Sequence, residues 1–417
     1  MTSASGPGDV PGPLRRRLPI APGAPPAPRR LALADEVREV DRRARPVYAV
    51  WEITLACDMG CGHCGSRAGR ARPDELSTDE ALRVIDELAG LGVREVTLIG
   101  GEAYLRADWL DLVARIAARG MRPTLATGGR GVTPQVARDA AAAGLTFASV
   151  SIDGHRDAHD QLRAQAGAYD QALAALGAFR AAGVTTSSNC QRNRISVPTL
   201  DPLLADLAVA GVVSWRVQLT VAMGRAADAP EMLLQPHDLL SLFPLLSALH
   251  TRAAALGVRL TPGNNVGYFG PYEHQLRRGE TGHMSSCQAG IATIGLEADG
   301  SVKGCPSLPT AAWTGGNVRD ASLLELWQRS APLRVMRDRT VDDLWGFCRT
   351  CYYADECRAG CTWTGHVLFG KPGNNPYCHH RALELARVGK RERLVRVVAA
   401  PGEPFDHGRF ELVVEDA

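Results

Sequence analysis

A chain of 417 residues with a net charge of +2 is long enough for about three globular domains, and its near-neutral charge argues against nucleic-acid binding. The sequence contains neither an apolar signal region after Met1 nor an uncharged apolar run of about eighteen residues, so secretion and a membrane span are both disfavoured. We therefore expect a cytoplasmic protein. In a reducing cytoplasm its eleven cysteines would more often be metal ligands than disulfides.

The first 46 residues differ in composition from the rest of the chain. They are rich in Pro and Arg and lack apolar periodicity, which predicts a flexible segment with one short helix near Leu31–Arg43. The segment is either a solvated tail or a docking arm for an acidic partner.

Residues 47–235 alternate short apolar runs with helical patterns. The candidate strands are Val50–Leu55, Glu95–Ile99, Pro123–Ala126, Ala148–Ile152, Val184–Asn189 and Trp215–Leu219. The candidate helices are one capped by Ser77 and Glu80, then Trp109–Ala118, Pro134–Ala143, Ala168–Ala182 and Leu200–Ala210. Successive β-α units predict an α/β fold whose parallel sheet curls into a partial (β/α)6 TIM-like barrel.

Unusual residues follow each candidate strand at its carboxyl end. In chain order they are Cys57/Cys61/Cys64, Gly100-Gly101-Glu102, Thr127-Gly128-Gly129, Ser151-Ile152-Asp153-Gly154, Asn189-Cys190 and Thr220–Arg225. In a β/α barrel these strand ends share one rim, where active sites are built, so we expect all six positions to converge. For the Thr127 segment itself, an ordinary turn is favoured over a phosphate loop.

The spacing Cys57-x-x-x-Cys61-x-x-Cys64 indicates an iron–sulfur site. Three thiolates can hold three irons of a four-iron cluster and leave the fourth open to S-adenosylmethionine, whereas a structural zinc site normally closes its shell with a fourth protein ligand. Together with Gly100-Gly101-Glu102 after the next strand, the triplet resembles the radical SAM superfamily.

This resemblance implies a set of cofactor contacts. The three cysteines would bind a [4Fe–4S] cluster, and Gly100, Gly101 and Glu102 would contact the methionine amino group of S-adenosylmethionine. Ser151 and Arg163 would contact its ribose and carboxylate, and the backbone of residues 217–223 its adenine. His63 stands where the family usually has an aromatic residue that packs on adenine, and Ala103 stands where it has proline.

The C-terminal third carries seven of the eleven cysteines, between Cys287 and Cys378. We expect a connector over residues 236–282 with a long helix, Pro236–Leu256. A small metal-held domain follows over residues 283–390, and then a tail over 391–417 with strand-like pieces at Leu394–Val398 and Phe410–Val414. The cysteine spacing is similar to that of the SPASM domain of radical SAM peptide-modifying enzymes, which carries two auxiliary iron–sulfur clusters.

The resemblance to SPASM assigns the remaining ligands. Cys287, Cys305 and Cys361 would hold an inner auxiliary cluster, and Cys348, Cys351, Cys357 and Cys378 an outer one. No further cysteine lies between Cys287 and Cys305, so the inner cluster would have an open iron, a non-cysteine ligand or fewer irons. A pair of zinc knuckles is the alternative for these spacings. Cys190 remains, either as a small buried hydrophobe or as a catalytic hydrogen donor at the barrel mouth.

The segments Ile99–Arg106 and Asn264–Tyr272 most resemble maturases of ribosomally made peptides. This resemblance implies an enzyme that reductively cleaves S-adenosylmethionine and uses the 5′-deoxyadenosyl radical to take hydrogen from a precursor peptide, with cross-linking, oxidation or epimerisation following. It also implies a reductase such as flavodoxin or ferredoxin. Because residues 1–46 are too short and too Pro-rich for the leader-binding module of many such enzymes, it implies either a separate leader-recognition protein or direct recognition of the peptide by the barrel. The alternatives are an anaerobic sulfatase-type maturase that forms formylglycine and a non-enzymatic zinc-binding interaction protein.

Overall fold

The computed structural model describes residues 33–267, 269–277 and 286–417. The Arg-rich leader at residues 1–32 lies outside this part. The first described helix is α1 (Glu39–Arg43), and residues 33–38 are not helical. Of the helix predicted near Leu31–Arg43, residues 31 and 32 lie outside the described part, and the described residues are helical only over Glu39–Arg43.

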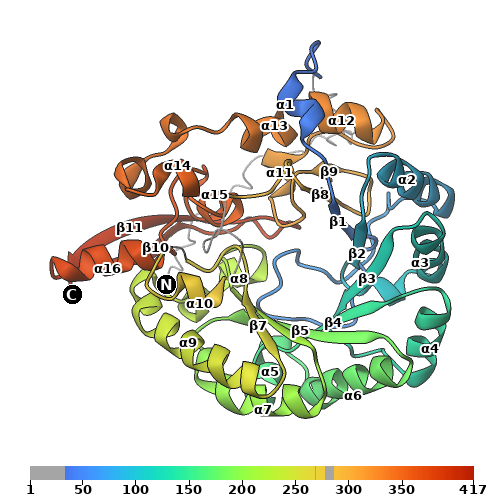
Figure 1. The fold of residues 1–417 in the computed structure, drawn as a ribbon, viewed down its shortest axis with the longest axis horizontal. Helices are drawn as coiled ribbons and strands as arrows, with labels where there is room; N and C mark the ends of the chain where they lie inside the picture. Colours follow the sequence, from blue (N-terminus) through green and yellow to red (C-terminus); the bar gives the residue numbers. More distant parts are fainter. Residues whose placement is uncertain (1–32, 268, 278–285) are drawn as a thin grey trace, which may run out of the picture.

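The core of the protein is one nine-stranded sheet in the order β7-β6-β5-β4-β3-β2-β1-β8-β9. Its strands are β1 (Tyr48–Glu52), β2 (Glu95–Ile99), β3 (Arg122–Thr127), β4 (Phe147–Ser151), β5 (Thr185–Arg192), β6 (Ser214–Leu219), β7 (Arg259–Pro262), β8 (Thr293–Leu296) and β9 (Val302–Lys303). All neighbours pair in parallel except β8 and β9. The sheet is strongly curved (Figure 1), which confirms the predicted partial barrel.

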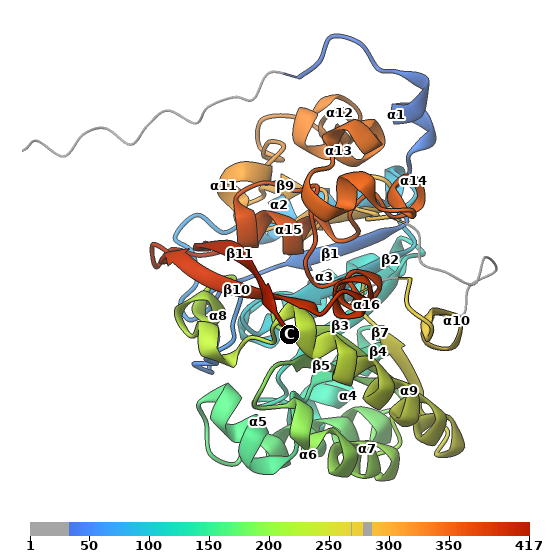
Figure 2. The same ribbon diagram turned by 90° about the vertical axis from the view of Figure 1, so that its left-hand side faces the viewer.

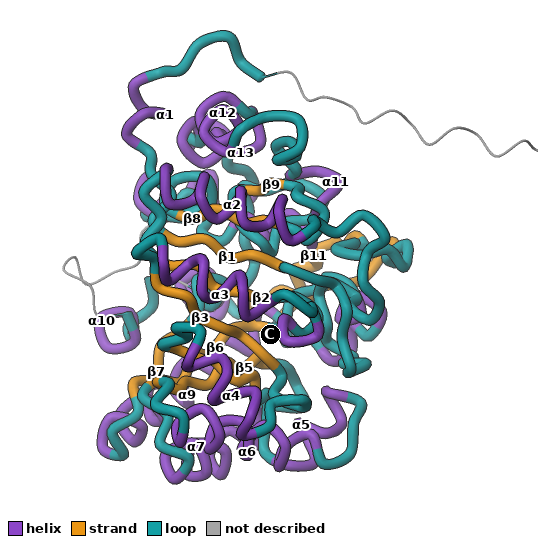
Figure 3. Tube along the Cα trace, turned by 90° about the vertical axis from the view of Figure 1, so that its right-hand side faces the viewer, coloured by secondary structure: helices purple, strands orange, loops and turns teal. Residues whose placement is uncertain are grey.

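Helices cover the convex side of this sheet, and Figure 3 shows α2 and α3 lying outside the strands. The covering helices are α2 (Thr78–Gly90), α3 (Trp109–Ala118), α4 (Pro134–Ala142), α6 (Ala168–Ala181) and α7 (Leu200–Val209). The predicted capping box is confirmed, because the Ser77 side chain accepts a hydrogen bond from the Glu80 N–H at 3.3 Å. α3 buries Leu112, Val113 and Ile116, which lie on one helical face.

Burial alternates along the strands and separates the two faces of the sheet. On β6, Trp215 and Val217 are fully buried, whereas Arg216 between them is exposed. On β4, Ala148 and Val150 are fully buried in the same hydrophobic core. Because side chains alternate along a strand, the apolar set faces the helices and the polar set faces the concave side of the sheet.

The sheet continues beyond the six predicted strands. β7 lies in the predicted connector, and β8 and β9 lie in the predicted C-terminal domain, where β8 pairs with β1 from Tyr48↔Thr293 to Trp51↔Leu296. These strands have four, four and two residues, too few to show a period in the sequence. Barrel and C-terminal region therefore share a sheet.

The long helix α9 (Leu239–Ala255) follows a 3-10 turn at Pro236–Asp238, close to the predicted Pro236–Leu256. With the preceding turns it forms a helical stretch, Pro230–Ala255, that has the length and apolar composition of a membrane span, half of it buried. Phe243 and Leu246 on α9 are fully buried in the main core, where a packing role accounts for their apolar character.

The C-terminal region consists of short helices followed by a hairpin. The helices are α11 (Thr310–Trp313), α12 (Leu323–Arg329), α13 (Ala331–Asp338), α14 (Ala354–Cys357), α15 (Thr362–Phe369) and α16 (His379–Arg387). The hairpin pairs β10 (Lys390–Val398) with β11 (Arg409–Asp416), which matches the two strand-like pieces. Figure 2 shows it between these helices and α8 (Arg225–Asp228), a helix of the barrel.

Candidate functional site

The cysteine loop, residues 56–67, follows β1 and carries the first three thiols. Cys61 is buried, and Cys57 and Cys64 are partly buried. Burial raises the pKa of the Cys57 thiol to about 12, and the nearby Cys61 and Cys64 sulfurs add to the increase. The structure thus brings the predicted triplet together in a partly desolvated position.

This donor set fits an iron–sulfur cluster. Buried thiols are unfavourable as free thiolates, and metal coordination removes that penalty by neutralising the charge. The Arg163 Nη1 lies 3.7 Å from the Cys61 Sγ and supplies a further positive charge. Among the described residues, no three His, Cys, Asp or Glu side chains are arranged to hold a single metal ion. A four-iron cluster spaces its thiolates more widely than one ion does.

Gly100 and Gly101 lie against the backbone of the cysteine loop. The Gly101 N–H donates to the Thr54 carbonyl oxygen at 2.9 Å, and the Glu102 N–H donates to the Ala56 oxygen at 2.7 Å. A Cβ on either glycine would overlap one of these two oxygens. The glycines are therefore required for the end of β2 to pack on the loop. The sequence had suggested only that they admit a ligand.

Glu102 is almost fully buried, with an exposed fraction of 2%. Its Oε2 accepts a hydrogen bond from the Thr127 hydroxyl at 2.5 Å, and its Oε1 accepts one from the Gly128 N–H at 2.6 Å. Burial raises the pKa of the Glu102 carboxyl to about 7. The predicted turn after β3 thus has the specific task of orienting this carboxylate.

Asp153, which follows β4, holds three segments together. Its Oδ2 lies 2.9 Å from the His63 Nε2 and 2.6 Å from the Arg163 Nη2, and its Oδ1 accepts the Gln191 N–H at 2.9 Å. Burial works to raise the pKa of Asp153, but the Arg163 and His63 charges lower it overall. No role for Asp153 was predicted. The sequence showed only that an acidic residue lies among the unusual residues that follow this strand.

The other predicted contact residues lie around Asp153. Arg163, at the end of α5 (Arg156–Arg163), also donates to the Ser151 carbonyl oxygen at 3.2 Å. His63 is buried, and its Nδ1 lies 3.0 Å from the Leu162 oxygen, so both ring nitrogens have protein partners. This arrangement fixes the cysteine loop against α5. Adenine packing by His63 stays a prediction.

A second segment holds the loop from the other side. The Arg225 N–H donates to the Cys64 oxygen at 2.9 Å, and the Arg225 Nε donates to the Cys61 oxygen at 2.6 Å. The Gly224 N–H in turn donates to the Asp406 oxygen at 2.8 Å in the turn of the C-terminal hairpin. This contact could not be predicted from the sequence, because it joins residues distant in the chain.

The seven C-terminal cysteines form two groups. One pocket is lined by the predicted outer set, Cys348, Cys351, Cys357 and Cys378, with Phe347, Tyr353 and His380 among its other walls. In the predicted inner set, burial raises the pKa of Cys361 to about 12, with further contributions from Cys287 and Cys305. Each group combines sulfur donors with an apolar surround, which fits an iron–sulfur cluster.

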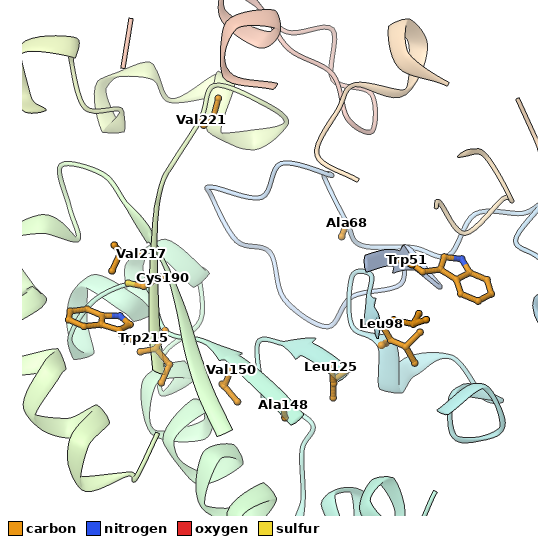
Figure 4. Packing of buried hydrophobic residues seen from close by; sticks show 14 of the residues in the cluster. Trp51, Ala68, Leu98, Leu125, Ala148, Val150, Cys190, Trp215, Val217 and Val221 are labelled. Atoms are coloured by element: carbon orange, nitrogen blue, oxygen red, sulfur yellow. The ribbon is translucent and has the colours of Figure 1, made fainter. Parts of the chain in front are cut away.

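Cys190 lies apart from both groups. It is fully buried beside Trp215 and Val217, on the face of the sheet that packs against helices (Figure 4). The buried Arg192 donates a hydrogen bond to its sulfur. This position favours the packing role over the hydrogen-donor role.

Comparison with known proteins agrees with this site. The model of the Radical SAM superfamily matches residues 51–191, and that of SPASM, an iron–sulfur cluster-binding domain, matches residues 287–352. The mycofactocin maturase MftC of Mycolicibacterium smegmatis is 30% identical over 355 residues, covering 82% of this chain and 86% of that protein. The chain is therefore a radical SAM enzyme. Within that superfamily it belongs with the SPASM-containing proteins that include peptide maturases.

Other relatives have different activities. The AdoMet-dependent heme synthase of Methanosarcina barkeri is 28% identical over 349 residues, covering 81% of this chain and 97% of that protein. Among solved structures, Streptococcus suis SuiB bound to S-adenosylmethionine has a TM-score of 0.62 at 15% identity, covering 80% of this chain and 76% of SuiB. Native anSMEcpe with bound AdoMet and the Cp18Cys peptide has a TM-score of 0.64 at 16% identity, covering 81% of this chain and 95% of anSMEcpe. These structures support the fold.

Proposed function

We propose that this protein is a peptide maturase that reductively cleaves S-adenosylmethionine and uses the 5′-deoxyadenosyl radical to take hydrogen from a ribosomally made precursor peptide. Cross-linking, oxidation or epimerisation of the peptide would follow. The observation that carries the proposal is the partly buried three-thiol loop joined to Glu102 and Arg163, in a chain 30% identical to a peptide maturase.

In this proposal Cys57, Cys61 and Cys64 hold a [4Fe–4S] cluster, which when bound supplies the electron that breaks S-adenosylmethionine. Glu102, oriented by Thr127 and Gly128, accepts hydrogen bonds from the amino group of the methionine part. Asp153 fixes the Arg163 guanidinium near the cluster, where it can meet the carboxylate.

The auxiliary ligands are proposed as the two groups that the structure brings together. Cys287, Cys305 and Cys361 would hold the inner cluster, and Cys348, Cys351, Cys357 and Cys378 the outer one. Both would accept or relay an electron if the peptide product is oxidised. We further propose a cytoplasmic reductase, flavodoxin or ferredoxin, and a separate leader-recognition protein as partners.

One other activity is favoured by a specific observation. The heme synthase relative matches over 97% of its own length, so modification of an iron porphyrin is the second candidate function. A sulfatase-type maturase that forms formylglycine is a third, because the same cluster ligands would serve it. Membership of the radical SAM superfamily argues against the non-enzymatic zinc-binding alternative.

The test uses anaerobically purified holoenzyme with S-adenosylmethionine and a strong reductant. Three substrates are offered in parallel: the short peptide encoded beside this gene, a sulfatase-derived peptide, and iron-coproporphyrin III. We expect a mass change in the first only, with 5′-deoxyadenosine formed in proportion and neither product formed by Cys61→Ala. Modification of the porphyrin alone would overturn the proposal.

A further inference from the structure

A row of polar residues crosses the concave face of the sheet at one level. Ser151 on β4 is the register partner of Asn189 on β5, which is the partner of Arg216 on β6, which is the partner of Thr261 on β7. Register partners on adjacent strands project from the same face. A hydroxyl, an amide, a guanidinium and a second hydroxyl therefore lie side by side.

Two observations place Arg216 on the concave face. Its neighbours Trp215 and Val217 are fully buried against the helical layer, so the exposed Arg216 projects the opposite way. Burial raises the pKa of the Tyr48 phenol, while the Arg216 charge acts on it in the opposite direction. Tyr48 lies on β1, with four strands between β1 and β6 in the sheet order, so the Arg216 charge reaches it across the concave side of the sheet without a direct contact.

Arg216 has no protein partner within the described residues, where it makes no hydrogen bond or ion pair. Arg122 on β3, by contrast, pairs with Glu95, whereas Arg259 at the start of β7 is also exposed and makes no side-chain hydrogen bond or ion pair among the described residues. The adjacent Asn189 Oδ1 is also buried without a hydrogen-bond partner. The Arg216 guanidinium can therefore donate hydrogen bonds to a ligand, and the adjacent Asn189 Oδ1 can accept one from it.

The Tyr48 side of the concavity is different. The Tyr48 hydroxyl lies 2.9 Å from the Thr97 hydroxyl, which lies 2.7 Å from the Thr124 hydroxyl. These groups satisfy one another and carry no charge at neutral pH. The Arg216 guanidinium is thus a charged group of this surface without a protein partner among the described residues, it lies in the same row as Ser151 and Asn189, and its planar fork matches a carboxylate.

We propose that Arg216 and Asn189 form the part of the substrate site that binds a carboxylate of the peptide, with Asn189 accepting an adjacent peptide N–H. The carboxylate is an Asp or Glu side chain or the peptide's C-terminus. The inference rests on the proposed function, because Ser151 in the same row is a proposed S-adenosylmethionine contact and the reacting carbon must lie nearby. Arg163 is already committed to Asp153 and the Ser151 oxygen.

The experiment uses holoenzyme with S-adenosylmethionine and a pool of random hexapeptides, prepared once with free C-termini and once amidated. Peptides retained by the protein are sequenced by mass spectrometry. We expect wild type to retain peptides that carry a carboxylate, with at least about tenfold enrichment that falls to background in Arg216→Gln and partly returns in Arg216→Lys. If only the free-acid pool is enriched, the C-terminus is bound; enrichment of Asp or Glu in both pools identifies a side chain.

Two controls make the result specific. Arg138→Gln changes an exposed arginine on α4 and should retain peptides as wild type does. The dissociation constant for S-adenosylmethionine should be unchanged in Arg216→Gln. The proposal is overturned if that constant rises, if Arg216→Gln selects the same peptides, or if only iron-coproporphyrin III binds in an Arg216-dependent way. Selective retention of acidic peptides that are never modified would count against the proposed function and support the carboxylate site.

Discussion

The Arg67 Nε lies 2.7 Å from the Asp406 Oδ1, an ion pair that joins residues 339 positions apart. Arg67 belongs to the cysteine loop, and it also binds Asp228 through two hydrogen bonds of 2.6 and 2.8 Å. Asp406 lies in the turn of the C-terminal hairpin, whose backbone holds Gly224. The end of the chain therefore contacts the loop that is proposed to carry the first cluster.

We predict that Asp406→Asn loosens this loop. The pair is largely buried, so loss of one partner should cost about 1–3 kcal/mol locally, although Asp228 still holds Arg67. Iron and sulfide at the first cluster, followed by its electron paramagnetic resonance signal, should fall while the auxiliary signals persist. Glu411→Gln, an exposed position on β11, is the control and should match wild type. An unchanged first-cluster signal in Asp406→Asn would contradict the prediction.

Substitution of single cysteines should separate the cluster groups. Cys61→Ala should abolish cleavage of S-adenosylmethionine, because it removes a ligand of the proposed first cluster. Cys348→Ala, in the outer group, should leave uncoupled 5′-deoxyadenosine formation but spoil the peptide product. Chromatography of 5′-deoxyadenosine and mass spectrometry of the peptide measure the two outcomes. Complete loss of both activities in both correctly folded variants would argue against separate roles.

Asp153→Asn should weaken binding of S-adenosylmethionine on the order of tenfold. The neutral amide keeps the shape of the side chain but no longer balances the Arg163 charge at 2.6 Å, so the guanidinium loses its fixed position. Anaerobic calorimetry gives the dissociation constant. Asp157→Asn, on the exposed first turn of α5, should bind as wild type does. Equal affinity in the two variants would remove the positioning role of Asp153.

The parts of the fold predicted well are those with strong local periodicity. The strand Glu95–Ile99 and the helix Trp109–Ala118 begin and end where the sequence predicted, because each carries a full apolar face between clear stop signals. β8 was not predicted, since four residues cannot show a period and its pairing with β1 is a tertiary event.

The site residues, too, could be predicted only where the signal lies within a short stretch of sequence. The cysteine triplet was visible because its ligands lie within eight residues of one another. Asp153 was not recognised as its organising residue, because its three partners His63, Arg163 and Gln191 come from separate segments that only the folded barrel brings together. Asp406 was missed for the same reason, as nothing in the local sequence links it to Arg67.

Glu52 should make stability depend on pH. Burial raises its pKa to about 7, against the effect of Arg72, so the folded state binds a proton that the unfolded chain with a pKa of 4.5 does not. Stability from this group is therefore present at low pH and lost as pH rises through about 7. Between pH 6 and 8 the wild type should lose on the order of 1 kcal/mol more than Glu52→Gln.

Thermal unfolding of the anaerobic holoenzyme at pH 6, 7 and 8 measures this difference. The comparison with Glu52→Gln isolates this group, because other groups titrate in this range in both proteins: burial raises the pKa of Glu102 to about 7 and lowers the pKa of His159, His366 and His379 to about 4. The pKa of Glu297 is lowered, so this residue changes the pH dependence of stability only below about pH 4.5 and has no effect between pH 6 and 8. Parallel pH profiles for wild type and Glu52→Gln would show that Glu52 does not change its protonation state between pH 6 and 8.

Two glycines near the cysteine loop offer a matched pair of substitutions. A Cβ at Gly101 would overlap the Ala56 oxygen, so Gly101→Ala must push the end of β2 away from the loop. A Cβ at Gly60, within the loop, would meet nothing within 4 Å. We expect Gly101→Ala to destabilise the protein by roughly 2 kcal/mol or more and to lower first-cluster iron, and Gly60→Ala to change stability by less than about 0.5 kcal/mol. If both variants bind iron and S-adenosylmethionine equally, the contact between β2 and the loop does not position the first cluster. Gly101 would then be needed only where a ligand approaches.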